Sequence, residues 1–129
     1  MKKNVAVIGS SGAIGNAVSK ILLDDESVDS VYNFSRSASP NISDKEHRIY
    51  IDIEIEQSIK DAVEKIPPDI KFDLIFVATG ILHNDKDVYP EKSIRDISAH
   101  RFKKVLMIKT VGPALVGNYC IPFLNKENK

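Results

Sequence analysis

The sequence lacks most features that would place a protein in a specialised class. Cys120 is the single cysteine, so an internal disulfide is excluded and a buried packing role in a reducing compartment is expected. Lysine plus arginine equals aspartate plus glutamate at 18 each, which argues against a general nucleic-acid binder. No run approaches the roughly 18 consecutive apolar residues of a membrane-spanning helix. These absences predict a cytoplasmic protein without a membrane or nucleic-acid partner.

The start of the chain, MKKNVAVIG, superficially resembles an export signal because two lysines precede an apolar run. That run is four residues long before Gly9, shorter than the roughly 7–15 apolar residues of a signal. The remaining composition, with 43% hydrophobic and 28% charged residues, is typical of a globular protein. A length of 129 residues suits one domain, covering residues 1–129.

Apolar strand patterns alternate with helical patterns along the chain, which predicts an α/β fold with a parallel sheet. We expect strands at residues 4–8, 30–35, 48–53 and 73–78. The last of these is the most apolar, so we expect it to be the central strand. The order of elements favours a Rossmann-type doubly wound sheet, truncated to about four strands.

Helical patterns fill the intervals between the expected strands. Apolar residues at helical spacing follow the first strand, and a short amphipathic helix is expected at 55–66. A short helix near 91–96 and a long one at 99–124, capped by Ser98, complete the pattern. Pro113 lies inside the long helix, so the helix must either bend there or break into two pieces. The apolar positions of the first helix are Ile14, Val18, Ile21 and Leu22.

The stretch VAVIGSSGAIG joins the first strand to the first helix through small residues. Gly9 permits a tight turn, Gly12 leaves room for a ligand, and Gly15 lets the helix pack closely on the sheet. Exposed amides at a helix N-terminus bind phosphate or pyrophosphate. A dinucleotide site is therefore expected at Gly9, Ser10, Ser11, Gly12, Ala13, Ile14 and Gly15.

The spacing of these glycines is G-x-x-G-x-x-G rather than the more familiar G-x-G-x-x-G, so their setting between strand and helix carries the prediction. Two alternatives stay open beside it. The glycines could serve helix–sheet packing alone. A mononucleotide P-loop is poorly supported, because no Gly-Lys-Ser/Thr follows.

The end of the second strand indicates which dinucleotide fits. A site for NAD carries an acidic residue about 20 positions after the glycines. Here the strand ends in Ser35, Arg36 and Ser37, and Asp29 would lie at the wrong end. A guanidinium suits a 2′-phosphate through charge-assisted hydrogen bonds. Arg36 therefore predicts NADP in preference to NAD.

Taken together, GSSGAIG, the third strand YIDI and the segment VATG after the fourth strand resemble the short-chain dehydrogenase/reductase superfamily. The resemblance implies that Asp52 reaches the adenine, with Ile53 against the ring. It also implies that Ala78, Thr79 and Gly80 match the family's Asn-Asn-Ala-Gly segment. Across essentially the whole chain, the sequence is similar to the C-factor-like branch, through Leu82-His83, Pro90-Glu91-Lys92-Ser93 and the run from Thr110 to Leu115.

The resemblance implies an oxidoreductase that acts on a carbonyl or alcohol, yet the sequence departs from the family twice. Lys109 stands where the family has an asparagine in the long helix, and it would add a positive charge beside the nicotinamide pocket. None of the four tyrosines has a lysine four residues later, so the family's Tyr-x-x-x-Lys is missing, as is its catalytic serine. The resemblance therefore implies the N-terminal, cofactor-binding portion of such an enzyme, with no catalytic residue of its own.

Three further expectations complete the sequence-based picture. A catalytically inactive dinucleotide-binding or interaction module is the alternative function, and an extended sugar-nucleotide epimerase is a weaker one. A sheet stopping at four strands would expose an edge, so we expect a homodimer or higher oligomer through the 99–124 helix, unless its apolar stripe packs within the chain. The stripe comprises Val105, Leu106, Ile108, Val111, Leu115 and Val116.

The three histidines, His47, His83 and His100, are too dispersed for a metal site.

Overall fold

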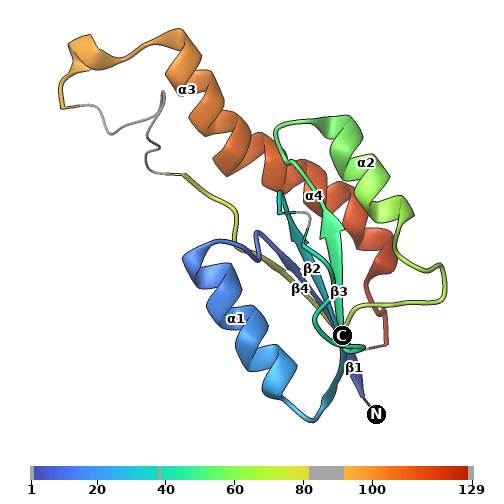
Figure 1. The fold of residues 1–129 in the computed structure, drawn as a ribbon. Helices are drawn as coiled ribbons and strands as arrows, with labels where there is room; N and C mark the ends of the chain where they lie inside the picture. Colours follow the sequence, from blue (N-terminus) through green and yellow to red (C-terminus); the bar gives the residue numbers. More distant parts are fainter. Residues whose placement is uncertain (1, 38, 82–91, 128–129) are drawn as a thin grey trace.

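A computed structural model describes residues 2–37, 39–81 and 92–127 of the chain. Four parallel strands form one sheet in the spatial order β3-β2-β1-β4 (Figure 1). This order matches the first four strands of the doubly wound fold, so the predicted Rossmann-type α/β sheet is confirmed. The strands are β1 (Lys3–Ile8), β2 (Val28–Ser35), β3 (Glu46–Tyr50) and β4 (Leu74–Val77).

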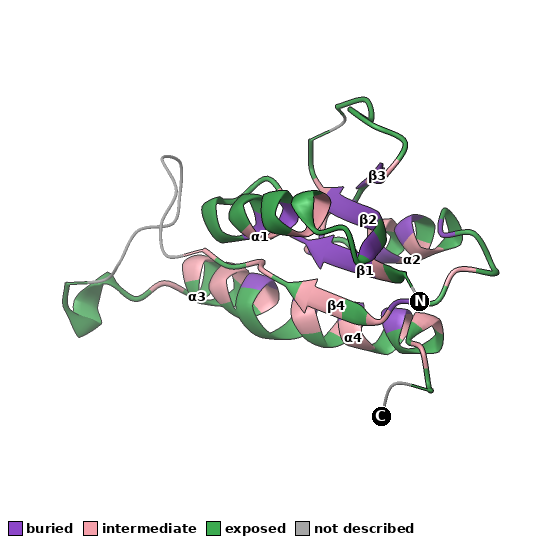
Figure 2. Ribbon diagram, turned by 90° about the horizontal axis from the view of Figure 1, so that it is seen from below, coloured by how far each residue is buried: buried purple, intermediate pink, exposed green. Residues whose placement is uncertain are grey.

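Helices cover both faces of the sheet (Figure 2). Helix α1 (Ala13–Asp24) packs on one face through Val18 and Leu22, over Val5, Val7 and Val31 of the central strands. Helices α2 (Glu56–Glu64) and α4 (Gly112–Cys120) lie together on the other face. The larger core cluster on that second face includes Ala6, Ile8, Tyr32, Phe34, Ile59, Ala62, Val116 and Cys120.

The position of β4 differs from the prediction, because β1 and β2 are central and β4 lies at an edge. Leu74 and Val77 of β4 are 43% and 38% exposed. Beside this edge, Phe72 and Leu124 form an isolated parallel bridge, in which Phe72 N–H donates to Phe123 C=O and Asn125 N–H donates to Phe72 C=O. The apolar content of β4 thus suits a strand with neighbours on both sides, while the described chain supplies one.

Strand β3 begins and ends earlier than the predicted 48–53. Its last paired residue, Tyr50, lies opposite Ser35, where β2 ends, so no strand partner exists beyond that point. Ile51 and Ile53 are nevertheless buried as the alternation predicts. At the start of the strand, Glu46 is buried despite its charge.

The helical stretch predicted at 99–124 is continuous but not uniform. Ser98 accepts a hydrogen bond from Arg101 N–H, which confirms the predicted cap of α3 (Ala99–Leu106). A π-helical turn, η2 (Met107–Val111), follows, and Gly112 N–H donates to Met107 C=O five residues back. This wider turn places Pro113 at the start of α4, where its missing N–H is tolerated. The stretch closes with a 3₁₀ turn, η3 (Ile121–Phe123).

The run Ala99–Phe123 is long and apolar enough, by length and composition alone, to cross a membrane. Part of its apolar surface is used within the chain, since Ile108, Val116 and Cys120 join the core beneath the sheet. Of the expected dimer stripe, Ile108 and Val116 are therefore internal, whereas Leu106 and Val111 are 42% and 45% exposed.

Two smaller expectations are corrected by the structure. Ile14 and Ile21 are 68% and 69% exposed, because the buried residues of α1 are Gly15 and Ser19 instead. The short helix expected at 91–96 is a 3₁₀ turn, η1 (Ile94–Asp96), with Ser93 as its cap. Leu82, His83, Tyr89, Pro90 and Glu91 lie outside the described residues.

Candidate cofactor-binding site

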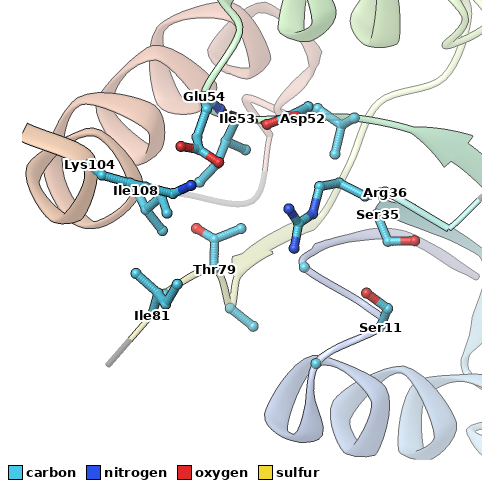
Figure 3. Close-up of a pocket in the computed structure, with 15 residues that line it drawn as sticks. Ser11, Ser35, Arg36, Asp52, Ile53, Glu54, Thr79, Ile81, Lys104 and Ile108 are labelled. Atoms are coloured by element: carbon cyan, nitrogen blue, oxygen red, sulfur yellow. Dashed lines mark hydrogen bonds between the residues drawn. The ribbon is translucent and has the colours of Figure 1, made fainter. Parts of the chain in front are cut away.

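Four loops meet at the carboxyl edge of the sheet and enclose a cavity of about 360 Å³ (Figure 3). All four strands are parallel, so the segments that follow them converge at this edge. The cavity lies where the strand order switches from β1 to β4, the position at which open α/β sheets bind ligands. The predicted residues in its lining are Gly9, Ser11, Gly12, Ser35, Arg36, Asp52, Ile53, Ala78, Thr79 and Gly80.

The glycine turn after β1 is built as its composition predicts. Gly9 has a φ of +88°, and its N–H donates to Phe34 C=O at 2.8 Å. A Cβ on Gly9 would lie 2.9 Å from the Ala78 carbonyl oxygen, and one on Gly15 would overlap the Gly9 carbonyl. Both positions therefore require glycine, and Gly15 packs against the turn rather than against the sheet.

The N-terminus of α1 faces this region without a side-chain cap. Its N-cap is Gly12, and the first turn contains no acidic residue. The first amides of a helix have no intrahelical acceptor, and the helix dipole adds partial positive charge there. This end of α1 can therefore accept an anion such as a diphosphate.

The remaining residues of the predicted glycine-rich site lie away from the lining. Ser10 Oγ donates to Phe34 C=O at 3.4 Å and lines a neighbouring cavity instead. Gly15 serves the turn geometry described above, and Ile14 points its side chain to solvent. Ala13 and Ile14 can contribute to the site through their backbone amides alone.

Arg36 follows β2 and presents the cation expected from the sequence. Its guanidinium extends toward the interior of the cavity in Figure 3. Behind it, Ser35 Oγ accepts from Ser37 N–H at 3.2 Å, which fixes the loop that carries Arg36. The second strand thus delivers a positive charge, without a carboxylate, at this edge of the sheet.

The loop after β3 is held by hydrogen bonds of Asp52. Glu54 N–H donates to Asp52 Oδ1 at 3.0 Å, and Asp52 N–H donates to Ser58 Oγ at 2.8 Å. These bonds join the loop to α2 and place Ile53 in the cavity wall. An apolar side chain beside a fixed carboxylate can hold an adenine ring, and Asp52 has a structural role as well.

Thr79 presents an unsatisfied polar group in the lining of the cavity. Its hydroxyl oxygen is buried and, among the described residues, has no hydrogen-bond partner. A buried unpaired hydroxyl costs about 1–3 kcal/mol, so such groups in native proteins are usually paired by a ligand or water. Together with the uncapped helix and Arg36, this orphaned group fits a dinucleotide.

Several residues of the lining belong to no motif in the sequence. Lys104 of α3 reaches the cavity and extends toward Glu54 and Ile53 in Figure 3. Lys109, expected beside the nicotinamide pocket, is exposed and is absent from the lining. No local signal marks Lys104, because its approach depends on how the long helix crosses the sheet. The other missed lining residues are Ile51, Glu54, Ile81 and Ile108.

The other candidate groups do not form a reactive centre in the described part of the chain. His47 stacks on Tyr32 with a centroid distance of 4.6 Å, in contact with the core. Burial raises the pKa of the Cys120 thiol to about 11, so the predicted packing role fits. No group of three or more potential metal ligands occurs among residues 2–37, 39–81 and 92–127.

Comparison with solved structures identifies the fold. A short-chain dehydrogenase family protein from Francisella tularensis superposes with a TM-score of 0.80 at 27% identity, covering 97% of this chain and 48% of that chain. The NADPH-bound carbonyl reductase from chicken fatty liver has a TM-score of 0.80 at 16% identity, covering 95% and 48%. A short-chain dehydrogenase/reductase from Burkholderia multivorans with bound NADP also reaches 0.80, at 17% identity, covering 97% and 55%.

By sequence alone, no protein-family model and no curated protein matches the chain. The chain spans about half the length of the solved structures that it matches. The similarity extends over 95–98% of the chain itself, in keeping with an N-terminal portion. The chain therefore has the structure of the N-terminal portion of a short-chain dehydrogenase/reductase, and the resemblance inferred from its motifs is confirmed at the level of that superfamily.

Proposed function

We propose that this chain is the cofactor-binding portion of an NADP-dependent oxidoreductase of the short-chain type. In the complete enzyme, the bound nicotinamide would exchange hydride with a small carbonyl or alcohol substrate. The observation that carries the proposal is the cavity at the β1–β4 switch point, which ten of the predicted residues line together. Two of the similar structures contain NADP or NADPH, which supports the choice of cofactor.

Each side of the cavity has a distinct role in this proposal. The amides at the start of α1 would hold the diphosphate, and Gly12 leaves that approach open. Arg36 would bind the 2′-phosphate, and Asp52 with Ile53 would hold the adenine. Thr79, with its orphaned hydroxyl, would donate to or accept from the cofactor on the β4 side.

Titration calorimetry with NADPH tests this function directly. We expect saturable binding by the wild-type chain, and Arg36→Ala should weaken it about 10- to 100-fold, since hydrogen bonds to charged groups contribute about 1.5–3 kcal/mol. NADH binding should change little in the same variant. Arg95→Ala, which alters an exposed arginine in η1, is the matched control. Absence of NADPH binding by the wild type would overturn the proposal.

A second candidate is a dinucleotide-binding module without catalytic activity. It is favoured by Lys109, which stands at the family's asparagine position. A coupled assay with NADPH and simple aldehydes tests this second candidate. Turnover by this chain alone would exclude the inactive module.

We also propose that the protein is cytoplasmic and that it self-associates through the 99–124 helix. The exposed Leu106 and Val111 remain available for that contact, whereas Ile108 and Val116 are occupied in the core. Light scattering at tens of micromolar measures this, and a monomer at that concentration would contradict it.

A further inference from the structure

A second cavity, of about 290 Å³, adjoins the first between α1, β2 and β3. Ser11 and Ser35 line both cavities, so the two share a wall. The second cavity also contains two cationic side chains, Lys20 from α1 and Arg48 from β3. Neither residue belongs to a recognisable motif of the sequence, and neither lines the first cavity.

Arg48 is held in a defined position by buried polar groups. Its Nε donates to Glu46 Oε1 at 2.9 Å, and Asn33 Nδ2 donates to the same oxygen at 2.7 Å. Glu46 is 3% exposed, and Asn33 also donates to Ser19 of α1 at 2.7 Å. The guanidinium is therefore anchored through Nε to the protein interior.

This anchoring leaves the outer part of the guanidinium for another partner. In the part of the chain that the structure describes, the terminal nitrogens of Arg48 make no hydrogen bond, while its side chain is 26% exposed. A guanidinium pairs with phosphate through two parallel N–H bonds when its plane is fixed. Arg48 thus has the geometry of a preorganised phosphate ligand.

The charges of the cavity indicate where an anion could lie. Burial alone would raise the pKa of Glu46, but hydrogen bonds from Arg48 and Asn33 hold that pKa below its usual value, so the carboxylate stays charged. Asn33 Oδ1 is also buried without a partner among the described residues, so the deep end presents oxygen atoms and repels an anion. The shared wall, by contrast, offers the hydroxyls of Ser11 and Ser35.

We infer that the 2′-phosphate of the cofactor is held at this shared wall, with Arg36 on the side of the first cavity and Arg48 on the side of the second. Lys20 adds positive charge from α1. This inference rests on the proposed function, and it makes Arg48 a specificity-determining residue for NADP. Glu46 is then a positioning residue, because it acts by orienting the guanidinium of Arg48.

The test uses fragments that contain only the adenosine half of the cofactor. Adenosine 2′,5′-bisphosphate and 5′-AMP differ by the 2′-phosphate alone, and calorimetry gives the affinity ratio of the two. Arg48→Gln should reduce binding of the bisphosphate about tenfold or more and leave 5′-AMP unchanged. Glu46→Gln should reduce the same ratio by a smaller factor, and Arg48→Lys should restore part of it. Arg95→Gln is the control.

The outcomes separate this inference from the proposed function. If the wild type binds both fragments and Arg48→Gln leaves their ratio unchanged, the role of Arg48 is overturned and the dinucleotide site stands. An equal loss of both fragments in Arg48→Gln, with a lowered melting temperature, would also overturn it, as a purely structural role. If the wild type binds none of the three ligands, that is, neither fragment and not NADPH, both proposals are overturned.

Discussion

Strands β1 and β4 are built from nearly the same kind of residues and yet lie in opposite environments. Residues 5–8 of β1 read VAVI, and their side chains are at most 2% exposed. Residues 74–77 of β4 read LIFV, and the outer two are 43% and 38% exposed. The difference arises from the order of strands, because β1 lies between β2 and β4 while β4 has β1 on one side.

This contrast shows what an apolar run does and does not reveal. An apolar run of this length indicates a strand covered on both faces, and both strands are correctly located by that signal. Whether a strand is central or at an edge depends on pairings between distant parts of the chain. Charged residues and proline commonly protect the exposed edge strand of a sheet from pairing with another chain. Strand β4 contains neither.

Alanine substitutions in the segments that follow the two strands should give the largest difference in stability between the two regions. Gly15→Ala would drive a Cβ into the Gly9 carbonyl behind β1, and we expect it to lower the free energy of unfolding by about 3 kcal/mol. Gly80→Ala, after β4, meets no atom within 4 Å and should change it by less than about 0.5 kcal/mol. Urea unfolding followed by circular dichroism measures both, and equal effects would show that the turn after β4 is as tightly packed.

A matched pair of valines probes the strands themselves. Val7→Ala in β1 removes a side chain that is 0% exposed and should cost about 2–3 kcal/mol. Val77→Ala in β4, where the side chain is 38% exposed, should cost below about 1 kcal/mol. Thermal unfolding gives the two values under identical conditions. A comparable loss at Val77 would mean that a partner covers β4 in solution.

Burial of the Cys120 thiol in the core beside β1 and β2 should make the stability of the protein depend on pH. Cys120 has a folded pKa of about 11 against 9.0 for the free thiol, so the unfolded chain loses this proton first as pH rises. The stability that depends on the protonated thiol is fully present below pH 9 and falls by about 2 kcal/mol as pH approaches 11. Comparing Cys120→Ala with the wild type across this range isolates the effect, and parallel curves would contradict it.

Local signals predicted the glycine turn and the cation at Arg36 because both depend on neighbouring residues alone. Gly9, Gly12 and Gly15 follow directly from a strand that must turn sharply into a helix. Lys104 and Ile108 could not be predicted, since they reach the cavity only through the way the long helix packs.

The ends of β3 and the course of the long helix depended likewise on tertiary structure. Strand β3 stops at Tyr50 because its neighbour β2 stops at Ser35, a fact invisible within the segment 48–53. Pro113 correctly indicated an irregular helix, but the irregularity is a π turn rather than a bend or a break. The branch-level resemblance, including the segment around Pro90, remains a prediction.

The π turn at Met107–Val111 has a consequence for comparing this chain with others. It accommodates one residue more than an ordinary turn, and each residue of an α-helix rotates the following side chains by about 100°. Relatives with a regular helix here would align only with a one-residue gap inside the turn. Deleting a single residue there should therefore convert the π turn into a regular α-helical turn and leave the inward-facing side chains of both halves in the interior.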